Sequence, residues 1–160
     1  MAGSLALFLG EGMVLSAANI VAPLCYIAVT LLLYDLLKPV NRSVSLLAAC
    51  FGLLGCAVTL FRLSPFLVVR DLVFFGLQCL LVGYLILKST FLPRMLGALM
   101  VLAGLGWLTF LWPALANSLA PYNLVPGMLG EGALIVWFLV KGVNVQRWNE
   151  QAGVAGLRAR

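Results

Sequence analysis

The sequence contains no histidine and very little charge. Five of its 160 residues are acidic and ten are basic, which together make up 9% of the chain. Without histidine, the usual zinc and haem ligand sets cannot be assembled. The four cysteines, Cys25, Cys50, Cys56 and Cys79, show no C-x-x-C spacing that would mark a redox or zinc motif. We therefore expect no metal and no cofactor, and we expect cysteines that serve as small packing residues within helices.

Common catalytic motifs are also missing. The chain has no H-E-x-x-H, no G-x-S-x-G and no phosphate-binding loop. No predicted helix carries a pair of acids suited to intramembrane aspartyl chemistry, and Asp35 lies far in predicted depth from Glu131. These absences predict a protein that is not an enzyme.

Apolar residues, in contrast, make up 64% of the chain and occur in long blocks that have no polar face. Lipid solvates a helix on all sides, so such blocks are typical of membrane spans of about 17–25 residues. The sequence predicts an all-α membrane protein, a bundle of five transmembrane helices forming one domain over residues 1–148. A flexible cytoplasmic tail over 149–160 is expected to follow it. The predicted helices cover about 13–37, 44–61, 65–87, 96–115 and 124–140.

The basic residues gather on one predicted side of the membrane. Eight of the ten flank the inner ends of the helices: Lys38, Arg42, Lys88, Arg94, Lys141, Arg147, Arg158 and Arg160. The opposite side holds two basic and two acidic residues, Arg62, Arg70, Glu11 and Asp71. Cytoplasmic loops carry an excess of Lys and Arg, so we predict an N-terminus outside and a C-terminus in the cytoplasm. The net charge of +5 then reflects topology and attraction to anionic lipid, and we expect no nucleic-acid partner.

Small residues recur at the four-residue spacing that lets helices pack closely. They are Ala48, Gly52 and Cys56 in the second predicted helix and Cys79 and Gly83 in the third, while the fourth is dense in glycine from Gly97 through Gly104 to Gly106. In lipid, such faces replace the hydrophobic effect as a source of helix association. Two interpretations stay open, namely packing within the bundle and a homodimer face.

Glu131 is an acid inside the last apolar block. A carboxylate at membrane depth costs about 2.5–3.5 kcal/mol on insertion scales, which makes it a candidate functional residue. Counting from Lys141 at a rise of 1.5 Å per residue places Glu131 about 15 Å deep, and Gln78 lies at a similar depth. Four further polar residues fall near the outer boundary: Asn19, Arg62, Arg70 and Asp71. The pattern predicts an outward-facing polar funnel with Gln78 and Glu131 at its base.

Three interpretations of Glu131 remain open at this point. The first is a structural one, in which the carboxyl is protonated or paired with Arg70 or Arg62 to hold the bundle together. In the second, Lys141 reaches toward the surface and Glu131 lies near the interface. The third is a site that handles a ligand or a proton.

Four segments resemble a known family. They are Leu31-Leu-Leu-Tyr-Asp-Leu-Leu-Lys-Pro-Val-Asn-Arg42, Phe74-Phe-Gly-Leu-Gln-Cys-Leu-Leu-Val-Gly-Tyr84, Phe91-Leu-Pro-Arg-Met-Leu-Gly97 and Gly130-Glu-Gly-Ala-Leu-Ile-Val-Trp-Phe-Leu-Val-Lys-Gly-Val143. Together they are similar to the uncharacterised bacterial integral-membrane family known as domain of unknown function four-three-eight-six. The resemblance covers about residues 5–148. It implies a multi-pass bacterial membrane protein and carries no known activity.

These observations predict a multi-pass protein of the bacterial cytoplasmic (inner) membrane whose first partner is the lipid bilayer. One function hypothesis is a non-enzymatic protein that forms a homo-oligomer or serves as an accessory subunit of a membrane complex. The other is binding or transport of a proton, a cation or another small ligand through the funnel that ends at Glu131.

Overall fold

The computed structural model describes residues 21–61, 68–119 and 122–158, with side chains for all of these except 61, 68–71 and 156–158. Within this part of the chain the elements are helices, and no strand occurs. The all-helical prediction is therefore confirmed there. The elements are a first helix over Val21–Leu37, α2 (Arg42–Phe61), α3 (Val68–Lys88), α4 (Arg94–Leu108), the 3₁₀ turn η1 (Thr109–Leu111), α5 (Pro113–Leu119), α6 (Leu124–Val140) and α7 (Val145–Arg158).

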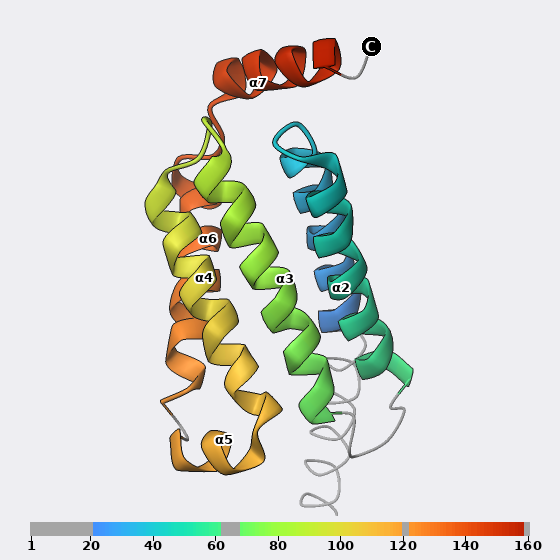
Figure 1. Cartoon of the computed structure of the whole chain (residues 1–160), viewed down its shortest axis with the longest axis vertical. Coiled ribbons are helices and arrows are strands. Elements are labelled where there is room, and N and C mark those ends of the chain that lie inside the picture. The colour runs from blue at the N-terminus through green and yellow to red at the C-terminus, as the bar shows by residue number, and fades with distance from the viewer. Residues whose placement is uncertain (1–20, 62–67, 120–121, 159–160) are drawn as a thin grey trace, which may run out of the picture.

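Helix α3 is the central element of the bundle. It packs against α2 on one side and α4 on the other, and α6 packs against α4 (Figure 1). The first helix lies beside α2, where the hydroxyl of Ser45 donates a hydrogen bond of 3.1 Å to the carbonyl of Tyr34. The long helices that follow one another along the chain run antiparallel, and the short connections after Leu37, Lys88 and Val140 all lie at the end that α7 crosses.

Glycines set the close approach of α3 and α4. A Cβ at Gly83 would lie 2.9 Å from the carbonyl oxygen of Gly97, and a Cβ at Gly97 would lie 2.9 Å from that of Gly83. One step of seven residues away, Gly76 and Gly104 form a second facing pair, with corresponding distances of 3.1 and 2.8 Å. Backbones that approach this closely gain dispersion contacts that bulkier residues would prevent.

The small residues of α2 also point into the same chain. Ala48 and Cys56 are buried, and Gly52 lies directly against the side-chain amide of Gln78 on α3. Among the described contacts, these faces are therefore used for packing within the bundle. This arrangement matches the first of the two interpretations drawn from the small-residue spacing.

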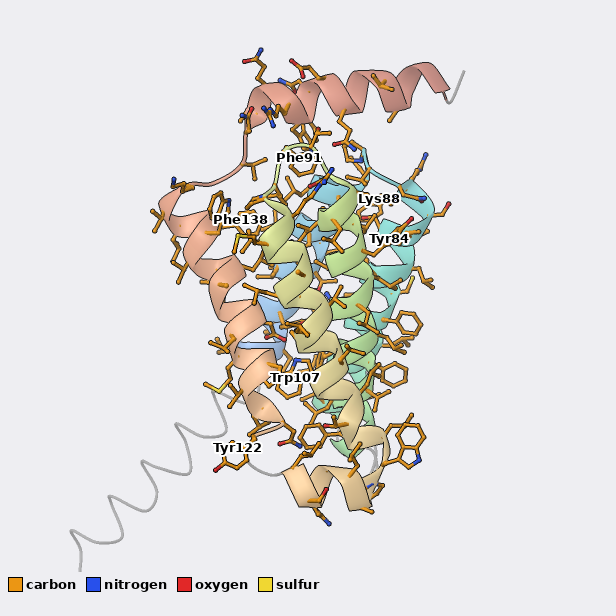
Figure 2. All side chains as sticks on the ribbon, turned by 60° about the vertical axis from the view of Figure 1, so that its left-hand side comes forward. Tyr84, Lys88, Phe91, Trp107, Tyr122 and Phe138 are labelled. Carbon is orange, nitrogen blue, oxygen red and sulfur yellow. The ribbon has the colours of Figure 1, made fainter. Side chains whose placement is uncertain are left out.

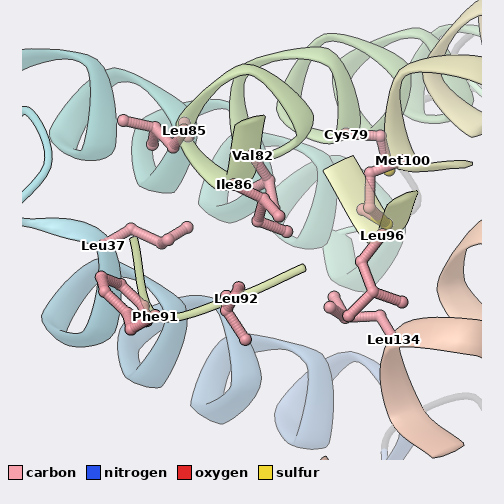
Figure 3. Close-up of a cluster of buried hydrophobic side chains, with 11 residues drawn as sticks. Leu37, Cys79, Val82, Leu85, Ile86, Phe91, Leu92, Leu96, Met100 and Leu134 are labelled. Carbon is pink, nitrogen blue, oxygen red and sulfur yellow. The ribbon is translucent and has the colours of Figure 1, made fainter. Parts of the chain in front are cut away.

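A buried apolar cluster joins the helices at the end of the bundle near α7. Figure 3 shows Cys79, Leu96, Met100 and Leu134 gathered where α3, α4 and α6 meet, and Leu37 beside Phe91. Phe91 belongs to the α3–α4 connection, and its ring is 5% exposed. The connection therefore folds back into the core instead of lying over it.

Many large apolar side chains point outward from the bundle. The most exposed aliphatic and methionine side chains are Leu32 (68%), Met128 (71%), Val140 (73%), Met95 (79%) and Leu139 (81%). Two helices, Arg42–Leu60 and Arg94–Leu111, are long and apolar enough to cross a membrane, and the bent pair formed by α5 and α6 raises the number to three if it counts as one span. The helices Val21–Leu37 and Leu72–Lys88 are apolar but shorter. Such outward apolar faces indicate a membrane protein.

The fourth predicted helix, over 96–115, is interrupted in the structure. Helix α4 ends at Leu108, η1 follows, and α5 begins at Pro113. Proline has no N–H to donate and disfavours helical geometry in the residue before it, and Trp112 is accordingly extended (φ −110°, ψ 103°). The hydropathy of this stretch is continuous, so the apolar pattern alone did not reveal the break.

The expected flexible tail from residue 149 is instead part of helix α7. Asn144 caps this helix, because its side-chain oxygen accepts a hydrogen bond of 3.1 Å from the backbone N–H of Arg147. Trp148 donates from its indole nitrogen to the carbonyl of Leu36 at 2.9 Å, and Gln151 accepts from the Thr90 hydroxyl at 3.0 Å. These contacts hold α7 across the end of the bundle (Figure 1).

Candidate functional site

The carboxylate of Glu131 joins three helices. Its Oε1 atom accepts a hydrogen bond of 2.9 Å from the indole N–H of Trp107 on α4 and one of 3.6 Å from the thiol of Cys79 on α3. Glu131 lies near the middle of α6, about 10 Å along the axis from Leu124 at 1.5 Å per residue. Both hydrogen bonds end on one oxygen atom, so the side chain of Glu131 links α6 to α4 and to α3.

Trp107 reaches Glu131 because α6 carries a glycine one turn earlier. A Cβ at Gly127 would lie 2.5 Å from Cζ2 of the indole, so the ring occupies the space that a side chain would need. Figure 2 shows Trp107 between α4 and α6. Gly130 allows the same close approach, since a Cβ there would lie 2.6 Å from the carbonyl oxygen of Leu99 on α4. The glycines of α6 therefore fix the position of the indole donor.

Only one oxygen of the carboxylate receives these donors. Glu131 is partly buried, and its Oε2 atom accepts no hydrogen bond from a described residue. Tyr26, on the first helix, lies within electrostatic range of Glu131 and Cys79, and its ring meets that of Phe75 edge-on at 4.7 Å between centroids. We refer to Glu131, Trp107, Cys79 and Tyr26 as the Glu131 cluster.

Gln78 faces a different side of α3 from Cys79. Its Nε2 atom donates a hydrogen bond of 3.2 Å to Oγ1 of Thr30 on the first helix, and its amide lies against Gly52 on α2. Successive residues of a helix point about 100° apart, and Gln78 and Cys79 accordingly hydrogen-bond to different partners, Thr30 and Glu131. Gln78 and Glu131, which were predicted to share the base of one funnel, have separate hydrogen-bond partners, and Cys79 is the α3 contact of Glu131.

The outer part of the predicted funnel lies outside the described residues. This holds for Asn19 and Arg62 altogether and for the side chains of Arg70 and Asp71, whose backbone belongs to the first turn of α3. Among the described side chains the ion pair is Lys38 with Asp35 at 2.7 Å, on the exposed surface. Within this part of the chain, no three His, Cys, Asp or Glu side chains gather to hold a metal ion.

Sequence reasoning missed Trp107, Cys79 and Gly127 as members of the site. Cys79 was expected to serve only as a packing residue, and Trp107 lies in an apolar block without a motif that marks it. One sequence signal was available. Gly127 lies four residues before Glu131 and hence on the same face of α6, which leaves space there for a side chain from a neighbouring helix.

The family assignment rests on two comparisons. The profile described as "Domain of unknown function (DUF4386)" matches residues 10–72 and 67–142. An uncharacterised protein of Archaeoglobus fulgidus is 33% identical over 127 residues, covering 72% of this chain and 76% of that relative. No solved structure matches the chain. The chain therefore belongs to this family of unknown function, and its apolar helices indicate a membrane protein.

Proposed function

We propose that this chain is a non-enzymatic, five-span protein of the cytoplasmic membrane, with its N-terminus outside and its C-terminus inside. The first helix, α2, α3, α4 and α6 would be the spans. The position of the charges supports this topology, because the end of the bundle crossed by α7 carries Lys38, Arg42, Lys88, Arg94, Lys141 and Arg147. A basic end of this kind faces the cytoplasm under the positive-inside rule.

The function that the geometry supports best is binding of a proton or a small cation at Glu131. The observation that carries this proposal is the uneven use of the carboxylate, whose Oε1 atom takes both donors while Oε2 takes none from the described residues. A carboxylate at membrane depth is expensive unless its charge is compensated. A proton or a cation at Oε2 would complete the compensation that Trp107 and Cys79 begin at Oε1.

A hydrophobic carbodiimide tests this proposal directly, because it reacts with protonated carboxyl groups in apolar surroundings. We expect one adduct per chain in lipid nanodiscs, located at Glu131 and lost in Glu131→Gln. Glu150→Gln, which changes an exposed glutamate of α7, is the matched control and should leave labelling unchanged. The yield should fall as a cation that binds the carboxyl group is added. Labelling that is absent from the wild type, or that is equal in both variants, would contradict the proposal.

Proteoliposomes test whether binding extends to transport. A pH-sensitive dye enclosed in the vesicles should report a proton flux, or a cation flux coupled to protons, for the wild type that Glu131→Gln abolishes and Glu150→Gln retains. Carbodiimide labelling without flux would limit the role of Glu131 to binding.

The second candidate function is self-association, or service as an accessory subunit in a membrane complex. The outward face of α6 supports it, because a Cβ at Gly132 would meet nothing within 4 Å while Met128 and Val136, one turn to either side, are 71% and 59% exposed. A small residue between apolar ones lets a second helix approach closely. Native mass spectrometry in lipid should detect a dimer or a stable complex, and Gly132→Leu should dissociate it. A monomer at all concentrations would contradict self-association.

A further inference from the structure

Gln78 carries a buried oxygen that has no partner. The residue is 3% exposed, and its Nε2 atom donates to Thr30 while Oε1 accepts from none of the described residues. Exchanging the oxygen and nitrogen of the amide would not remove the problem, because Nε2 would then become the unpartnered atom. A buried polar atom without a hydrogen bond costs roughly 1–3 kcal/mol, so a compensating group is expected.

Gln78 also lines a small cavity. The space open to the centre of a water molecule is about 10 Å³, which is close to the minimum that one water requires. The cavity wall is Thr30, Leu33, Tyr34, Leu37, Ser45, Ala48, Ala49, Gln78, Val82 and Leu85. It contains hydroxyl and amide groups but no carboxylate, ammonium or guanidinium. A neutral ligand fits this lining better than a cation, whose charge would be uncompensated.

We infer that one buried water molecule occupies this cavity and donates a hydrogen bond to Oε1 of Gln78. Its second proton is available to Ser45, whose hydroxyl already donates to the carbonyl of Tyr34 and therefore has lone pairs free to accept. The water then joins Gln78 on α3 to Ser45 on α2, and Gln78 in turn holds Thr30 on the first helix. Buried waters with two or more such partners are structural parts of a fold.

This water site is independent of the proposed role of Glu131. Gln78 faces the first helix and α2, whereas Cys79 faces α6 and the Glu131 cluster. Loss of carbodiimide labelling at Glu131 would leave the water site untouched, and loss of the water would leave that labelling unchanged. The two proposals therefore fail by different measurements.

A cavity-filling substitution decides whether the space is wet or dry. Val82→Ile adds one methylene group at the wall of the cavity and keeps the β-branched shape of the side chain. If water is bound, the added carbon displaces it, strands Oε1 of Gln78 and lowers the thermal unfolding midpoint by about 2–4 °C. If the cavity is dry, the same change fills it and raises the midpoint.

The background Gln78→Met separates water displacement from overpacking, because it removes the amide but keeps a side chain of similar length. In this background, Val82→Ile should leave the midpoint unchanged or raise it. A higher midpoint for Val82→Ile in the wild type would overturn the inference, as would an equal lowering in both backgrounds.

A high-resolution structure in lipid provides a test that does not depend on how the variants fold. We expect a density peak within hydrogen-bond distance of Oε1 of Gln78 in the wild type. Absence of this peak, with Gln78 and Ser45 well ordered, would overturn the inference, and so would a peak with the short distances of a sodium ion.

Discussion

The indole nitrogen of Trp107 lies 2.9 Å from Oε1 of Glu131 and ties α4 to α6 at the middle of the bundle. Because of this bond, the indole of Trp107 is part of the polar environment of Glu131. It also explains the position of Gly127, whose missing side chain provides the space in which the indole ring lies. The properties of Glu131 should therefore respond to changes in α4 and in the preceding turn of α6.

Trp107→Phe should destabilise the protein through loss of this single hydrogen bond, because the aromatic packing is largely kept. We expect a fall of about 1–2 kcal/mol in the free energy of unfolding, measured by denaturant titration in detergent micelles. In a Glu131→Gln background the cost should be smaller by about 1 kcal/mol, since the strong acceptor is gone. Trp112→Phe, which changes an indole that is 64% exposed, is the control and should show no coupling to Glu131.

Gly127→Ala should displace the indole of Trp107. The added Cβ would lie 2.5 Å from the ring, so the ring or the helix must move, at a cost of about 1–3 kcal/mol in unfolding free energy. The tryptophan emission spectrum should shift as Trp107 leaves the carboxylate. Gly153→Ala in α7 is the control, since its Cβ meets nothing within 4 Å and the residue lies outside the face of α6 proposed for self-association. Equal effects of the two substitutions would refute the packing argument.

Gly83→Ala and Gly97→Ala should separate α3 from α4. Each added Cβ would lie 2.9 Å from a backbone carbonyl, which cannot move aside without shifting its helix. We expect a loss of about 1–3 kcal/mol for each substitution, measured by the same titration. Gly153→Ala in α7 provides the comparison, because nothing lies within 4 Å of its Cβ. Tolerance of both interior substitutions would show that the glycine pairs do not set the helix spacing.

Trp148→Ala should release α7 from the end of the bundle. The change removes the hydrogen bond to the carbonyl of Leu36 and the packing of the indole against the buried cluster. Backbone amide exchange in α7 should accelerate by roughly tenfold, the equivalent of about 1.4 kcal/mol of local stability. Asn149→Ala, on the exposed side of the same helix, should leave exchange nearly unchanged. Unaltered exchange in Trp148→Ala would mean that other contacts hold α7.

Helix positions followed from the sequence wherever an apolar block had clear ends. The predicted helix over 124–140 coincides with α6 because the chain supplies a stop, Gly142, whose φ of 65° only glycine adopts readily. The predicted helix over 96–115 was wrong beyond Leu108, since hydropathy does not register a proline. Helix α7 was missed because its segment is polar and rich in small residues, which is also typical of a flexible tail. The helix start is marked by Asn144, whose side chain caps it.

The candidate site was predicted only in part. The composition identified Glu131 as an acid in an apolar helix, which requires nothing beyond the local sequence. Depth counting placed Gln78 at a similar level but could not give its direction, because a level on a helix does not specify which neighbour a side chain faces. The contact with Trp107 joins residues that are 24 positions apart, and no local pattern encodes it.

The sequence by itself determined that this protein is built from apolar helices, that most of its basic residues lie near one end of them, and that one acid lies within the α6 segment. These properties depend on the free energy of transferring side chains between water and lipid. The composition of each segment sets that free energy independently of the other segments. The tertiary structure alone decided that Cys79 and Trp107 meet Glu131 and that Gln78 turns away toward Thr30. The reason is the rotation of each helix about its own axis. Glycine pairs such as Gly83 with Gly97 fix this rotation, and the rotation decides which neighbours the interior polar groups meet.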